Sequence, residues 1–169
     1  RKDLAFLGGD GHAPNVDAVQ WFVEQVMPLM RRLAPGVRFL IYGSDVSPEV
    51  RKLECDDVVI KGFIEQVADA FDDCRVFVAP LRYGAGFKAK VAAALAHGVP
   101  CVVSRIAAEG LVYDDDPALS IAETPEEWAA AILRYYHESS QWTAASQAAR
   151  VYAQRRFQFD AGVRRLSAV

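Results

Sequence analysis

The residues best suited to chemistry lie between Pro80 and Lys90, where a loop joins an apolar strand to a helix. The loop carries Gly84 and Gly86, which allow the backbone to approach a ligand closely. Backbone amides at the start of a helix attract an anion, and Lys88 and Lys90 stand in the expected first turn. Lysines there oppose the helix dipole unless an anion lies between them and the amides. This pattern indicates a phosphate site, although two solvated lysines at an ordinary helix start also explain the spacing.

The sequence gives little support for a P-loop, a metal site or a reactive thiol. The loop lacks the Gly-Lys-Ser/Thr ending of a P-loop. Adjacent carboxylates rarely point at one ion, so Asp114–Asp116, followed by Pro117, is predicted to form a solvated turn rather than a metal site. We expect no metal and no cofactor. The three cysteines show no C-x-x-C spacing, which is typical of small apolar side chains in a reducing compartment; they are Cys55, Cys74 and Cys101.

Composition limits the class of protein. The chain has 169 residues, of which 52% are hydrophobic and 24% charged, enough for one domain with a core that needs no disulfide. A net charge of −3 argues against electrostatic binding of nucleic acid. No apolar run approaches the ~20 residues that span a bilayer. The chain begins at Arg1 and has no signal peptide, so we expect it to be part of a longer protein.

Short apolar runs alternate with segments of helical spacing as far as residue 138. This alternation predicts an α/β fold, a doubly wound parallel sheet of about six strands in a single Rossmann-like domain over residues 1–169. Ligands of such sheets bind beyond the carboxyl ends of the strands, where this chain is rich in glycine. The predicted strands are Leu4–Leu7, Arg38–Tyr42, Asp57–Ile60, Val76–Pro80, Cys101–Val103 and Leu119–Ile121. The predicted helices run from Pro14 to Pro35 with Asn15 as N-cap and a break at Pro28, over Pro48–Leu53, Ile64–Phe71 and Phe87–His97, and from Thr124 to Leu166 with breaks near Ser139 and Asp160.

Nine segments carry a further signal through their order and spacing. They are Phe6–Gly9, Ala13–Val19, Trp21–Phe22, Lys61–Ile64, Val78–Lys88, Ala94–Pro100, Ala108–Leu111, Thr124–Leu133 and Arg155–Asp160. Together they resemble the C-terminal, nucleotide-sugar-binding domain of the group 1 glycosyltransferases, retaining enzymes of the GT-B fold. The resemblance covers nearly the whole chain, and it implies that the chain is one half of a GT-B fold.

The resemblance implies a donor site at the carboxyl edge of the sheet, with a nucleotide-diphosphate sugar as substrate. In this family the donor phosphate is thought to assist departure and to deprotonate the acceptor, so no protein nucleophile is expected and the catalytic residues stay unassigned. The diphosphate would rest on Gly84, Gly86, Phe87 and Lys88; the base and ribose would lie near Lys61, Gly62, Phe63, Ile64 and Glu109; further donor contacts would come from Gly9, His12, Arg82 and Tyr83.

Three of these residues have a second interpretation. His12 either contacts the donor or is a solvated loop histidine. Tyr83 either stacks on a sugar or base, or covers an edge of the core. Glu109 either accepts hydroxyl groups of the ribose or sugar, or caps the turn before Gly110.

The chain departs from the family at its hallmark pair of glutamates, spaced E-x(7)-E. Ala85 and Ala93 stand at these two positions. The second glutamate normally accepts hydrogen bonds from the ribose, each worth roughly 1.5–3 kcal/mol with a charged acceptor. The basic pair expected after the first strand is also missing, and only His12 stands there. The domain is therefore either a working donor-binding half with altered ribose contacts, or a degenerate, non-catalytic module that serves as a scaffold or docks a partner.

The resemblance also implies what lies outside the chain. The acceptor site would belong to an N-terminal domain that this chain does not contain, so the isolated chain is expected to be inactive. The setting implied is assembly of a bacterial surface polysaccharide or another glycan in the cytoplasm. Any peripheral contact with the inner face of the membrane would come through the missing half.

Overall fold

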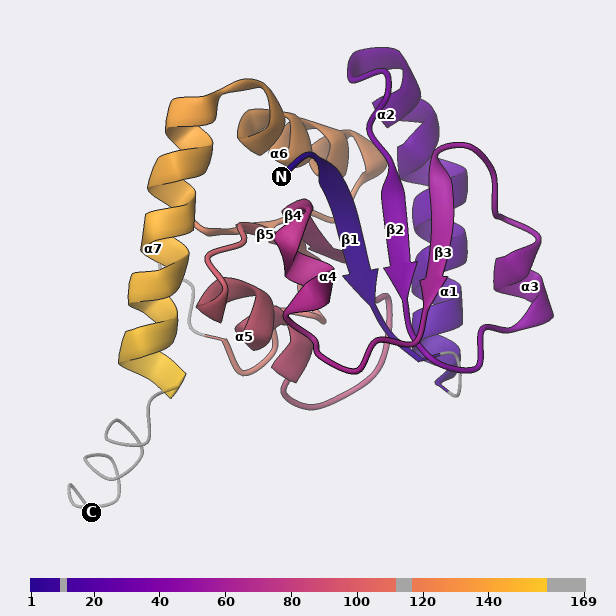
Figure 1. Cartoon of the computed structure of the whole chain (residues 1–169), viewed down its shortest axis with the longest axis horizontal. Coiled ribbons are helices and arrows are strands. Elements are labelled where there is room, and N and C mark those ends of the chain that lie inside the picture. Colours follow the sequence, from indigo (N-terminus) through magenta and orange to yellow (C-terminus); the bar gives the residue numbers. More distant parts are fainter. Residues whose placement is uncertain (10–11, 112–116, 158–169) are drawn as a thin grey trace.

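The computed structural model describes residues 1–9, 12–111 and 117–157. In this part of the chain, six parallel strands form one sheet in the order β3-β2-β1-β4-β5-β6 (Figure 1). The order reverses between β1 and β4, because the chain builds outward from β1 in one direction and from β4 in the other. The strands are β1 (Asp3–Leu7), β2 (Phe39–Tyr42), β3 (Val58–Gly62), β4 (Cys74–Ala79), β5 (Cys101–Val103) and β6 (Leu119–Ile121).

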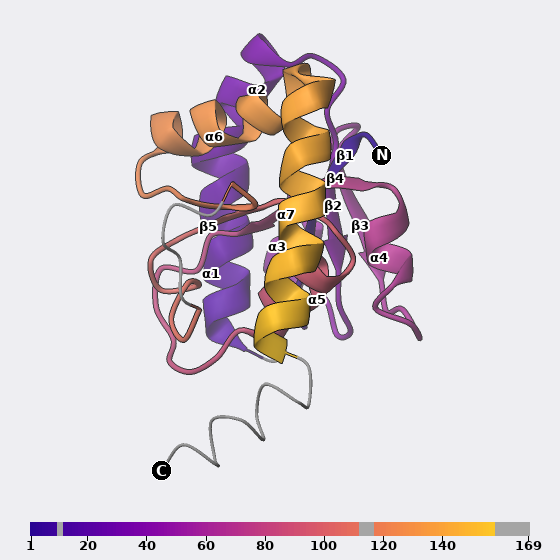
Figure 2. The same ribbon diagram turned by 90° about the vertical axis from the view of Figure 1, so that its left-hand side faces the viewer.

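Helices cover both faces of the sheet (Figures 1 and 2). The helices α1, α2 and α6 lie on one face, with α6 in contact with α2, and α4 and α5 lie on the other. The last helix, α7, packs against both α5 and α6. The helical elements are α1 (Ala13–Trp21), the π-helical turn η1 (Phe22–Val26), α2 (Met27–Leu33), α3 (Pro48–Arg51), α4 (Asp69–Asp72), α5 (Ala89–Ala96), α6 (Pro125–His137) and α7 (Ser139–Phe157).

The central strands are apolar on both faces because each face is covered by helices. Every residue of β1 is buried. This includes Asp3, whose carboxylate accepts hydrogen bonds from Nε and Nη2 of Arg38, the closer at 2.7 Å. A buried carboxylate is tolerated when it is paired in this way, so the pair fixes the start of β1 beside β2.

Two local signals set the position of α6. Thr124 accepts a hydrogen bond from the Glu127 N–H, and the Glu127 side chain accepts one from the Thr124 N–H, which forms a capping box. On the buried side of the helix, Trp128 packs edge-on against Trp21 and Phe22 at centroid distances of 6.2 and 5.8 Å. The cap and the tryptophan together hold α6 against α1 and η1.

The predicted strands are confirmed within two residues at each end, and the helix break near Ser139 is confirmed between α6 and α7. The prediction of a helix over Ile64–Phe71 is wrong, because only Asp69–Asp72 is helical. Val67 in this segment and Phe63 just before it are exposed, so no continuous apolar face stabilises a longer helix.

Two predicted helix starts are also wrong. Asn15 is not the N-cap of α1: His12 takes that position, and the Asn15 amide donates a 2.7 Å hydrogen bond to the Gly9 carbonyl oxygen. The helix predicted from Phe87 begins at Ala89, because the backbone of Lys88 is not helical. Asp114–Asp116 and the predicted continuation of the last helix to Leu166 lie outside the described residues.

Thr124→Ala is expected to lower the free energy of unfolding by about 1 kcal/mol, because it leaves the Glu127 N–H at the start of α6 without its acceptor. Thr143→Ala, in the exposed part of α7, is the matched control and should change the free energy of unfolding by less than about 0.5 kcal/mol. Urea denaturation followed by circular dichroism measures both. Equal unfolding midpoints for the wild type and Thr124→Ala would contradict this role of the cap.

Candidate functional site

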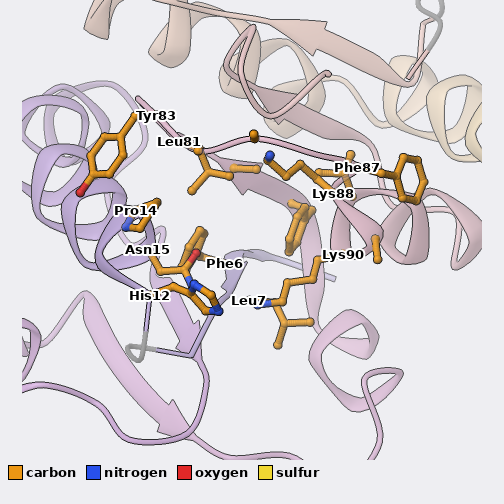
Figure 3. A pocket seen from close by; sticks show the side chains of 16 residues that line it. Phe6, Leu7, His12, Pro14, Asn15, Leu81, Tyr83, Phe87, Lys88 and Lys90 are labelled. Carbon is orange, nitrogen blue, oxygen red and sulfur yellow. The ribbon is translucent and has the colours of Figure 1, made fainter. Parts of the chain in front are cut away.

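A cavity of about 400 Å³ opens between the carboxyl ends of β1 and β4, where the strand order reverses (Figure 3). Open parallel sheets bind ligands at this place, because the loops leaving the two strands diverge toward opposite faces. The lining residues come from β1, the start of α1, β4, the loop after β4 and the start of α5. They are Phe6, Leu7, His12, Pro14, Asn15, Phe77, Ala79, Leu81, Tyr83, Gly84, Ala85, Phe87, Lys88, Ala89, Lys90 and Val91.

The pocket combines an apolar interior with positive groups. Side chains of the strands, such as Phe6 and Phe77, supply the apolar part. The titratable lining side chains include Lys88, Lys90 and His12, and none of the described residues that line the pocket is Asp or Glu. In a chain with a net charge of −3, this segregation favours an anionic ligand at this edge of the sheet.

The loop from Leu81 to Lys88, here called the donor loop, forms one wall of the pocket. Gly84 and Gly86 have φ values of 112° and 88°, in the left-handed region that favours glycine. Lys88 takes the N-cap position of α5, and its Nζ donates a 2.6 Å hydrogen bond to the Gly86 carbonyl oxygen. The donor loop is therefore folded back on itself immediately before α5.

The first residues of α5 border the same pocket. Within the described residues, no acceptor is found for the backbone N–H groups of Ala89 and Lys90, both of which line the pocket. Unpaired amides at a helix start, together with the helix dipole, favour an anion.

Lys90 differs from Lys88 in its surroundings. In Figure 3 its side chain extends from α5 across the pocket in the direction of His12. No carboxylate of the described residues forms an ion pair with it. The lysine keeps exposed surface, but partial desolvation by the pocket walls lowers its pKa below the usual range. An anion in the pocket would offset the desolvation cost of the charged Lys90 ammonium by supplying an opposite charge.

The structure brings part of the predicted donor set together. His12, Tyr83, Gly84, Phe87 and Lys88 line the pocket, as does Ala85 at the first hallmark position. Tyr83 and Phe87 are 46% and 52% exposed, and Phe87 points away from the other lining side chains (Figure 3).

Other predicted residues lie outside this lining. Arg82 donates to both carboxylate oxygens of Asp17 on α1, with Nε 2.8 Å from Oδ2. The Gly86 N–H donates a 3.1 Å hydrogen bond to Glu109 Oε2. Gly9 follows β1 without lining the cavity, the base-binding segment Lys61–Ile64 lies at the end of β3, and Ala93 is a partly buried residue of α5.

The sequence analysis named Gly9 and His12 in the turn between β1 and α1, but it missed other residues of β1 and of the start of α1. Leu7, Pro14 and Asn15 line the pocket, and the Asn15 amide ties α1 to the Gly9 carbonyl oxygen. Their position directly after a predicted parallel strand was the available signal, because all carboxyl ends meet at one edge of the sheet.

A second cavity, of about 240 Å³, lies on the other side of Leu81 beside Trp21 and Trp128. Its polar side chains are already engaged within the chain. Arg82 binds Asp17, Glu123 accepts a hydrogen bond from the Arg105 N–H, and Ser104 donates to the Leu81 carbonyl oxygen. This cavity therefore offers less for a ligand than the pocket between β1 and β4.

Three structural findings bear on metal, membrane and thiol sites. Among the described residues, no cluster of three or more His, Cys, Asp or Glu side chains is placed to hold a metal ion. In the same residues, no helix combines the length and apolar character that crossing a bilayer requires. The three cysteines are free; Cys74 and Cys101 are buried as expected, whereas Cys55 is exposed.

The sequence matches the family described as "Glycosyl transferases group 1" over residues 1–138. The chain belongs to the group 1 glycosyltransferases. No curated protein sequence matches this glycosyltransferase chain significantly.

Solved structures share the fold of the chain at low sequence identity. S. aureus TarM, in a complex that includes UDP, is similar with a TM-score of 0.81 and 16% identity, over 99% of this chain and 35% of TarM. Pneumococcal GtfA, in complex with UDP and GlcNAc, is similar with a TM-score of 0.71 and 18% identity, over 90% of this chain and 32% of GtfA. The chain therefore spans about a third of the length of these two proteins. The C-terminal domain of LpcC from Francisella tularensis, which has 14% identity and a TM-score of 0.73, matches over 94% of this chain and 87% of that domain. These matches confirm the Rossmann-like α/β fold predicted from the sequence.

Lys90→Met is expected to weaken binding of inorganic pyrophosphate about five- to tenfold, because it removes a pocket charge that has no partner in the described residues. The same change should raise the melting temperature slightly, since a charge that is costly to desolvate is lost. Because the pKa of Lys90 is lowered, its contribution to anion binding should also disappear at a lower pH than that of an ordinary lysine.

Lys52→Met removes an equal charge outside the pocket and is the control. Isothermal titration calorimetry and thermal denaturation measure the two effects. Equal pyrophosphate affinity in both variants would contradict the assignment of Lys90 to an anion site.

Proposed function

We propose that the chain is the donor-binding half of a glycosyltransferase that transfers a sugar from a nucleotide-sugar to an acceptor. The observation that carries this proposal is the pocket between β1 and β4. It combines Lys88 and Lys90 with unpaired amides at the start of α5, and no carboxylate is found among its described lining residues. Such a site suits a diphosphate, and membership of the group 1 glycosyltransferases supports a nucleotide-sugar as its carrier.

In this proposal the diphosphate lies over Gly84 and the first turn of α5. When the bond to the sugar breaks, negative charge develops on the departing nucleoside diphosphate. The α5 amides of Ala89 and Lys90, with the two ammonium groups, stabilise that charge without moving far. To reach the phosphate, the Lys88 ammonium exchanges its hydrogen bond to the Gly86 carbonyl oxygen for one to the ligand.

The nucleoside end would extend along the same edge of the sheet toward β3. There the backbone of Gly62–Ile64 would contact the base, beside the exposed ring of Phe63. The complexes of TarM, GtfA and Anabaena HepE all contain UDP, so uridine is the first nucleoside to test.

The acceptor site belongs, in this proposal, to an N-terminal domain outside this chain. The chain covers only 32–35% of GtfA and TarM, and it corresponds closely in extent to the C-terminal domain of LpcC, whose crystal structure was determined as a separate domain. Sugar transfer would then need both halves. We propose the assembly of a surface polysaccharide or another glycan in the cytoplasm as the setting, with any membrane contact made by the other half.

One observation favours a second candidate, a non-catalytic scaffold. Ala93 stands where the family carries the glutamate that accepts hydrogen bonds from the ribose, and no acidic side chain is found among the described residues that line the pocket. A donor would then keep its phosphate contacts but lose a strong ribose contact.

Calorimetric titration of the chain with UDP, GDP and ADP separates the two candidates. The donor-binding function predicts saturable binding that prefers one nucleotide, and Lys88→Ala should weaken it about tenfold through loss of a charged contact. Binding that is absent in the wild type and restored by Ala93→Glu would contradict a working donor site and favour the scaffold.

A further inference from the structure

The donor loop is fastened at two points to the turn that follows β5. At its start, the Ser104 hydroxyl donates a 2.5 Å hydrogen bond to the Leu81 carbonyl oxygen. Near its end, the Gly86 N–H donates a 3.1 Å hydrogen bond to Glu109 Oε2. Two residues five apart on one turn therefore hold both ends of the loop.

The turn is itself well supported. Ser104 is buried, and its hydroxyl also accepts a 3.1 Å hydrogen bond from the Ala107 N–H. The N–H groups of Ala108 and Leu111 bond to the carbonyl oxygens of Ser104 and Ala108 at 3.0 and 2.9 Å. Because this turn continues directly from β5, it offers the donor loop a fixed support.

Arg82 also ties the loop to Asp17 on α1, but the backbone between Arg82 and Gly86 keeps the freedom that its glycines give it. Glycine has the widest conformational freedom of any residue, and Gly84 and Gly86 both adopt positive φ values. The loop nevertheless supplies much of one pocket wall. The lining residues that it contributes are Leu81, Tyr83, Gly84, Ala85, Phe87 and Lys88.

A contact beside Glu109 supports the same docking. A Cβ added to Gly110 would lie 3.4 Å from Cδ2 of Phe87, so the ring rests against this glycine. The hydrogen bond on Gly86 and the ring contact of Phe87 join adjacent residues of the loop to adjacent residues of the turn.

We propose that Glu109 is a positioning residue for the donor loop: through the Gly86 N–H its carboxylate holds the pocket wall in the arrangement that accepts a diphosphate, without contacting the ligand. This inference rests on the proposed donor-binding function. It differs from the expectation that Glu109 accepts ribose hydroxyls, because Glu109 does not line the pocket and its Oε2 is engaged by the loop.

The test compares pyrophosphate, which has no ribose, with UDP. Glu109→Ala should weaken the binding of both ligands by the same factor. The factor is about tenfold if the freed loop spends a tenth of its time in the arrangement that accepts a diphosphate. Glu109→Gln keeps an acceptor oxygen and should restore binding of both to within about twofold of the wild type. Glu126→Ala removes an equal charge from the first turn of α6 and controls for the general gain in anion affinity.

A second measurement needs no ligand. The Gly86 amide should exchange with deuterium about tenfold faster in Glu109→Ala than in the wild type, because its acceptor is gone. Glu109→Gln should preserve most of the protection, and Glu126→Ala should preserve all of it. Nuclear magnetic resonance of the full chain measures the exchange rate of this amide directly.

Three results would overturn the inference. They are an unchanged exchange rate of Gly86 in Glu109→Ala, a loss of UDP affinity with unchanged pyrophosphate affinity, and tighter pyrophosphate binding in Glu109→Ala than in Glu126→Ala. If the wild type binds neither ligand while the exchange of Gly86 responds as expected, the proposed function fails but the role of Glu109 in holding the loop stands.

Discussion

The chain leaves β1 through α1, which covers one face of the sheet, and it leaves β4 through α5, which covers the other face. The two neighbouring strands consequently send their loops in opposite directions, and a cavity remains between their carboxyl ends. Every feature of the candidate site follows from this reversal. The ends of β1 and β4 form the apolar interior. Lys88 and Lys90 stand at the start of α5, His12 stands immediately before α1, and the unpaired amides belong to the first residues of α5.

The fold could be predicted because its signals are local. Strands such as β4 and β5 are continuous apolar runs covered on both faces, and they were located within two residues. The start of α6 is predicted by the spacing of Thr124, Pro125 and Glu127 alone. A helix was wrongly predicted from Ile64 to Phe71 because apolar residues are frequent in this segment. The exposure of Val67 shows that these apolar residues do not share one buried face. For α5, the run of alanines predicts a helix but does not say at which residue the glycine-rich loop ends.

The site could be predicted only in part, because its contacts join residues distant in the sequence. The position of the pocket and the roles expected of Gly84 and Lys88 follow from the strand–loop–helix pattern. The pairing of Arg82 with Asp17 spans 65 residues, and that of Gly86 with Glu109 spans 23. No local pattern distinguishes an arginine that faces a ligand from one that ties two elements together. The desolvation of Lys90 likewise depends on which walls surround it, and a sequence does not show them.

The central claim is that the pocket between β1 and β4 holds a diphosphate on the first turn of α5. Nitrogen-15 chemical-shift mapping of the chain during addition of UDP tests it most directly, because it reports each backbone amide separately. The account predicts that the largest shifts fall on Gly84 and on the amides of Ala89 and Lys90, with those around Trp21 and Trp128 unchanged. Shifts concentrated at the two tryptophans, or spread evenly over the surface, would contradict it.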